Sequence, residues 1–245
     1  MSEAPLDKPS SALPLLLAAG CGAVAAALLL PAVLPALASS LSGSEAKAAW
    51  YLARAGGLVA YSLVWLATLL GLLITNRFAR LWPGGPVAFE VHQHASLLGT
   101  GFALFHAVVL LGDRYIGYQL WQIALPFAGD YRPLWVGLGQ IGFYLLLLVG
   151  LSFYVKQQIG PRTWRAIHVF SFAVFGMALL HGLLSGSDSS AAGVQLLYWA
   201  SGGSVLFLTL YRALGLLARP DPAGSRGRTR PDVLGKSAPS HRDAD

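Results

Sequence analysis

The stretch VAFEVHQHASLLGTGFALFHAVVLL, from Val87 to Leu111, decides the fold of this chain, because it is both apolar and rich in histidine. Its single formal charge is Glu90. As a helix it would rise about 37 Å, which exceeds the roughly 30 Å hydrocarbon layer of a bilayer. Imidazoles are costly inside a membrane and mark a functional site by default. The stretch therefore predicts a transmembrane helix that carries ligands.

The rest of the chain has the same apolar character. Of its 245 residues, 55% are hydrophobic and only 11% are charged, and the mean hydropathy is +0.58. A soluble domain needs more polar surface than this. Six segments of membrane length follow one another: Leu13–Ala38, Trp50–Thr75, Val87–Leu111, Trp135–Val155, Trp164–Leu184 and Val194–Leu217. We therefore expect an all-α integral membrane protein, a bundle of six transmembrane helices.

This interpretation divides the chain into three parts. Residues 1–12 form an N-terminal segment, residues 13–218 the six-helix domain, and residues 219–245 a basic tail whose Pro, Gly, Ser, Arg and Asp content predicts disorder. The run Ala36-Leu37-Ala38 resembles a signal-peptidase site, which leaves a cleaved leader as an alternative for the first segment. Glu3 and Asp7 make the preceding region acidic and argue against that alternative.

The basic residues predict the orientation. They gather after the second segment, between the fourth and fifth segments, and after the sixth, whereas the other side holds only Lys47, Arg54, Arg114 and Arg132. Cytoplasmic loops carry the excess of Lys and Arg. We therefore expect a multi-pass protein of the inner (plasma) membrane with both termini in the cytoplasm.

Five of the six histidines lie on only two segments. His92, His94 and His106 are on the third, and His168 and His181 are on the fifth. The fourteen residues from His92 to His106 correspond to about 21 Å along a helix and fall about 40° short of full turns, so both rings share a face. His94 is about 120° out of phase with His106, which leaves it at the helix end.

The thirteen residues from His168 to His181 leave the two rings about 140° out of phase on an ideal helix. This pair therefore requires tilt, a different side-chain approach or a local irregularity. Because the third and fifth segments run in the same direction, His92 comes level with His168, and His106 with His181. Each pair can bind one iron from two sides, giving two stacked haems about 20 Å apart.

Other metal sites fit this sequence less well. Zinc requires three or four converging ligands, and these pairs are too far apart to converge. The single cysteine, Cys21, provides neither an iron–sulfur site nor an intrachain disulfide. A haem-free transporter or assembly protein with structural histidines remains the alternative.

With these residues, the chain resembles the membrane domain of the ferric reductase-like transmembrane family, which includes NADPH oxidases, ferric reductases and bacterial relatives. The likeness covers Trp50 to Leu217 and depends on His92-x13-His106 and His168-x12-His181, with Arg54-Ala-Gly-Gly and Trp164-Arg-Ala-Ile-His168 as context. It implies two b-type haems, each ligated by two histidines. It also implies that Arg54 lies near a propionate of the outer haem, although an arginine that reaches the interface explains Arg54 as well.

The sequence departs from these relatives after the sixth segment. Ferric reductases and NADPH oxidases carry a flavin- and nicotinamide-binding domain there, whereas fewer than thirty residues follow here, without G-x-G-x-x-G. We therefore expect a separate flavoprotein or quinol as electron donor and an unidentified acceptor on the outer side. The membrane subunit of the periplasmic methionine sulfoxide reductase system has a comparable architecture.

Overall fold

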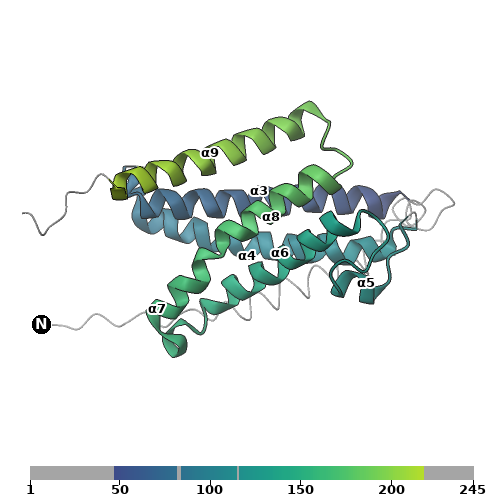
Figure 1. Ribbon diagram of the computed structural model, residues 1–245, viewed down its shortest axis with the longest axis horizontal. Helices are drawn as coiled ribbons and strands as arrows, with labels where there is room; N and C mark the ends of the chain where they lie inside the picture. Colours follow the sequence, from purple (N-terminus) through teal and green to yellow (C-terminus); the bar gives the residue numbers. More distant parts are fainter. Residues whose placement is uncertain (1–46, 82–83, 115, 218–245) are drawn as a thin grey trace, which may run out of the picture.

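The computed structural model describes residues 47–81, 84–114 and 116–217, and every regular element in these ranges is a helix (Figure 1). The predicted all-helical fold is confirmed for this part of the chain. Five of its helical stretches are long and apolar enough to cross a bilayer, as in a multi-pass membrane protein. The first predicted segment, Leu13–Ala38, the N-terminal residues 1–12 and the tail 219–245 lie outside the described residues.

The membrane-length helices pack as two antiparallel pairs with a fifth helix outside. In chain order the elements are α3 (Ala48–Thr75), η1 (Phe78–Arg80), α4 (Gly85–Val109), η2 (Leu110–Gly112), α5 (Leu120–Ala124), α6 (Pro133–Ser152), α7 (Lys156–Val169), α8 (Ser171–Ser185) and α9 (Ala192–Leu217). Helix α3 pairs with α4 and α6 pairs with α8, while α9 lies along the outer side of α3 (Figure 1). Helices α4 and α8 consequently run parallel.

Small residues bring α3 and α4 close together. Ala53, Gly56 and Ala60 are buried on α3, and a Cβ added at Gly56 would lie 2.9 Å from the Phe105 ring of α4. Gly99 of α4 is also tight, since a Cβ there would lie 3.3 Å from Leu63. In a membrane, helix association depends on such close packing because lipid is as apolar as the side chains.

Helix α9 is joined to α3 by polar contacts within an apolar interface. Tyr61 and Ser201 share a buried hydrogen bond, and Trp65 Nε1 donates to Ser204 Oγ at 3.0 Å. Phe175 of α8 stacks on Tyr61 with ring centroids 6.1 Å apart, so this interface also reaches α8. Phe175 therefore lies in a packed core.

The fifth predicted segment begins earlier than expected. Its helix starts at Lys156, and Gly160-Pro161 makes a kink inside α7 instead of a loop. Gly160 takes a left-handed φ of 79°, which glycine adopts without steric cost. The proline ring forces this departure because it would otherwise clash with the carbonyl one turn earlier.

The two ends of the bundle differ in charge and in loop length. We call one the basic end, because it carries Arg77, Arg80, Lys156, Arg162, Arg165 and Arg212. We call the other the loop end, because it carries α5 and the loop from α8 to α9. Gln140 of α6 holds α5 in place by donating to the carbonyls of Gln122 and Ile123 at 2.7 and 2.8 Å.

Candidate functional site

Four histidines form two facing pairs between helix α4 and the consecutive helices α7 and α8. His92 and His168 lie at the basic-end level, with ring centroids 6.1 Å apart and planes inclined by 67°. His106 and His181 lie toward the loop end, with centroids 6.2 Å apart and planes inclined by 77°. These are the two pairs that the sequence analysis matched by level.

A break in the helix separates the two histidines whose phase did not match. His168 is the penultimate residue of α7, and His181 lies in α8, which begins at Ser171. Between them the N–H of Phe170 reaches back to the carbonyl of Ile167 at 3.0 Å, a three-residue step that overwinds the chain. A local irregularity, one of the explanations that the sequence left open, therefore lies between the two histidines at Phe170.

Three of the four imidazoles donate to a backbone carbonyl of the neighbouring helix. Nδ1 lies 2.8 Å from the Ala67 oxygen in His92, 2.6 Å from the Ala53 oxygen in His106, and 2.9 Å from the Trp135 oxygen in His181. A carbonyl only accepts, so the proton of each neutral ring is on Nδ1. Nε2 is then the nitrogen with a free lone pair, and this arrangement is the usual one for a metal-ligating histidine.

A glycine four residues after each acceptor makes room for the ring. A Cβ at Gly57 would lie 2.9 Å from Nδ1 of His106, and one at Gly139 would lie 2.5 Å from Nδ1 of His181. Gly71 stands in the same relation to His92, with a looser contact of 3.5 Å to Cε1. Helical residues four apart lie on one face, so carbonyl and glycine together form a cradle for the imidazole. We call this the carbonyl–glycine cradle.

His168 is held differently. Its ring stacks on Trp164, one turn earlier on α7, with centroids 5.0 Å apart and planes inclined by 25°. The indole Nε1 of Trp164 is buried, and no acceptor among the described residues bonds to it. The two pairs are therefore not equivalent.

The distance within each pair fits one metal ion held from both sides. Two metal–imidazole bonds of about 2.0–2.1 Å, plus about 1.1 Å from each ring centre to its nitrogen, place the centroids about 6.3 Å apart. In the described part of the chain no three His, Cys, Asp or Glu side chains converge on one point. Such a pair suits a cofactor that supplies its own in-plane ligands, as a haem does.

His94 has no part in either pair. Its ring is exposed and bonds at 2.8 Å to the carbonyl of Glu90 on its own helix. This agrees with its phase, which places it away from the face that carries His92 and His106.

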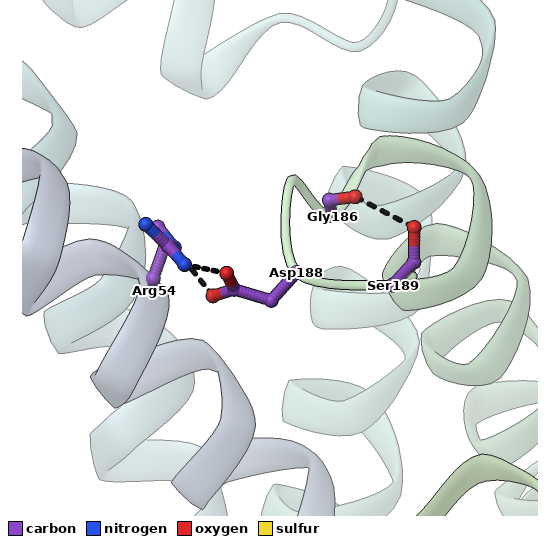
Figure 2. Close-up of polar contacts among 4 residues, drawn as sticks. All are labelled: Arg54, Gly186, Asp188 and Ser189. Carbon is purple, nitrogen blue, oxygen red and sulfur yellow. Dashed lines mark hydrogen bonds and ion pairs between the residues drawn. The ribbon is translucent and has the colours of Figure 1, made fainter. Parts of the chain in front are cut away.

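Arg54 meets a carboxylate from this chain. Figure 2 shows Arg54 of α3 facing Asp188 in the loop after α8, and two guanidinium nitrogens contact the two carboxylate oxygens. Ser189 donates to the Gly186 carbonyl across the same loop at 2.9 Å. The guanidinium also lies 4.0 Å above the Trp50 ring. The sequence alone suggested a haem propionate or the membrane interface as the surroundings of Arg54, and its pairing with Asp188 was not predicted.

The glycines are the other residues that the sequence analysis missed. Ala53 and Gly57 recur fourteen residues later as Ala67 and Gly71, which matches the spacing from His92 to His106 on the antiparallel helix. That shared fourteen-residue repeat could have identified the glycines from the sequence. It was not recognised because small residues are common in membrane helices for packing alone.

A family model, the domain of unknown function DUF8596, matches residues 48–188. This range includes both histidine pairs and ends at Asp188. No curated protein and no solved structure matches the chain. The chain belongs to the DUF8596 family.

Proposed function

We propose that this chain is a transmembrane electron-transfer protein that binds two b-type haems, one between His92 and His168 and one between His106 and His181. The observation that carries the proposal is the geometry of the facing rings, with centroids 6.1 and 6.2 Å apart. The resemblance to ferric reductase-like membrane domains supports the same assignment. We therefore propose that the chain carries electrons through the membrane, as those membrane domains do.

The residues of the chain hold and orient the ligating nitrogens. In the carbonyl–glycine cradle, the bond from Nδ1–H to the helix carbonyl fixes the ring and makes Nε2 a stronger ligand. The apolar helices exclude water from both pairs, which influences the redox potential. When bound, haem supplies an iron that alternates between ferric and ferrous states.

The spacing of the pairs suits a relay across the membrane. The fourteen residues from His92 to His106 correspond to about 21 Å of helix, against a hydrocarbon layer of about 30 Å. We assign the basic end to the cytoplasm of an inner (plasma) membrane, since basic loops stay inside. With the first predicted segment included, the bundle has six helices and both termini are cytoplasmic.

The donor in this proposal is a separate flavoprotein or quinol that acts at the basic end, and the acceptor acts at the loop end. Arg54 is our candidate for the residue that binds the anionic propionate edge of the outer haem. Asp188 already balances its charge, so the two anions would share one guanidinium. The chain is then the membrane haem subunit of an oxidoreductase.

Absorption spectroscopy of the purified protein tests the proposal. We expect a bis-histidine b-type spectrum and two haems per chain. H106A and H181A should each lose the loop-end haem, whereas H94A should keep both, because His94 is exposed and bonds only within its own helix. A protein that neither contains nor takes up haem would support the alternative, a haem-free transporter or assembly protein.

A further inference from the structure

The unusual feature of the basic-end pair is Trp164. Its ring stacks on His168, and its Nε1 is buried without an acceptor among the described residues. The indole N–H is only a donor, so it requires an acceptor from elsewhere. Because a buried donor without a partner is costly, this side chain is suited to a ligand that brings an acceptor.

A positive charge lies near the indole, over the face of its ring. Lys156 Nζ is 6.0 Å from the Trp164 ring and 4.3 Å from the Phe153 ring. Lys156 is the first residue of α7 and is exposed, so its ammonium is free to move toward a bound anion. An N–H donor with a mobile ammonium nearby fits a carboxylate, which accepts hydrogen bonds from both groups.

The loop-end pair, although its histidines are held differently, also has an unpartnered buried donor one turn from a paired histidine. Ser185 lies one turn after His181, as Trp164 lies one turn before His168, and its Oγ is also buried without a described partner. In each case the unpartnered donor lies on the helix that carries the ligand, displaced toward the nearer end of the bundle. This is the direction in which the charged groups of a membrane cofactor reach water.

We propose that the indole N–H of Trp164, assisted by Lys156, binds a propionate carboxylate of the basic-end haem. This inference rests on the proposed function. It assigns Trp164 two tasks, because the face of the indole supports the His168 ring and its edge binds the carboxylate. Trp164 thereby replaces the carbonyl–glycine cradle that the other three histidines use.

The test compares W164F with the wild-type protein, each loaded with haem or with haem dimethyl ester, in which both propionates are esterified. The readout is the rate of haem loss to a scavenging globin. With ordinary haem we expect W164F to lose one of its two haems roughly 10- to 100-fold faster, the effect of one hydrogen bond to a charged group. With the dimethyl ester we expect a much smaller difference between the two proteins, because the ester carbonyl accepts a hydrogen bond but carries no charge.

Two further variants keep the test decisive. W199F changes an exposed tryptophan of α9. It should lose haem, and haem dimethyl ester, at the same rates as the wild type. K156Q changes an exposed side chain, and its smaller effect should shrink with the ester and at high salt, because both weaken an interaction between charges. If W164F speeds the loss of haem and of its dimethyl ester by the same factor, Trp164 only supports the His168 ring and the inference is wrong. A wild-type protein that binds neither haem would overturn the proposed function and this inference with it.

Discussion

Replacing Gly139 by alanine should displace His181 without unfolding the helix that carries the glycine. The added Cβ would lie 2.5 Å from Nδ1 and 2.7 Å from Cγ of the ring, whereas non-bonded atoms rest about 3.5 Å apart. The ring must therefore move by about 1 Å, and metal–ligand bonds tolerate only about 0.2 Å. We expect G139A to lose the loop-end haem and to keep the basic-end one.

The stability of G139A should change little. Overpacking costs about 1–3 kcal/mol, but alanine gains about 1 kcal/mol over glycine inside a helix. G150A on the same helix is the matched control, because no described atom lies within 4 Å of its added Cβ. G71A is a second control, since its Cβ makes an ordinary contact of 3.5 Å with His92.

Haem content per chain and the oxidised and reduced absorption spectra measure the outcome. The wild type, G150A and G71A should each contain two haems, and G139A should contain one with the spectrum of the basic-end pair. If G139A keeps two haems with the wild-type spectrum, the cradle does not position His181 and the reasoning fails.

Three further predictions concern the fold around the site. Y61F removes the hydrogen bond to Ser201 between α3 and α9 and should lower the free energy of unfolding by about 0.5–1 kcal/mol, with Y61F/S201A less than additive in thermal unfolding. D188N breaks the partly exposed pair with Arg54 and should cost at most about 1 kcal/mol, a loss that would shrink in high salt if the pair is electrostatic. Burial raises the pKa of the Tyr118 phenol, so its contribution to stability is present below about pH 10 and is lost as the pH rises through the raised pKa; Y118F should flatten this alkaline decline, and an unchanged pH profile would contradict it.

The elements of the fold follow from local sequence. For the four described segments that form one unbroken helix each, hydropathy predicted both helix ends to within a few residues. This was possible because a membrane helix needs only length and apolar side chains. The fifth segment is preceded by extra helix, since α7 begins at Lys156. Gly160 has non-helical backbone angles, so the break that the composition of Gly160-Pro161 indicates is present inside α7.

The histidine pairs were predictable in part. Spacing on α4 selected His92 and His106 over His94, since one continuous helix carries all three. Spacing could not place His168 and His181 on one face, because an ideal helical period does not describe the irregular step at Phe170 between them. The ion pair of Arg54 with Asp188 was equally hidden, as its partners are 134 residues apart.

The sequence by itself determined that this chain forms membrane helices, that one end of the bundle is basic, and that the histidines gather on two segments. Only the tertiary structure decided how those rings are held. The acceptors of His92, His106 and His181 lie 25, 53 and 46 residues away on other helices. Hydropathy and helical period are properties of neighbouring residues, whereas a cradle exists only when a carbonyl and a glycine of one helix meet an imidazole of another.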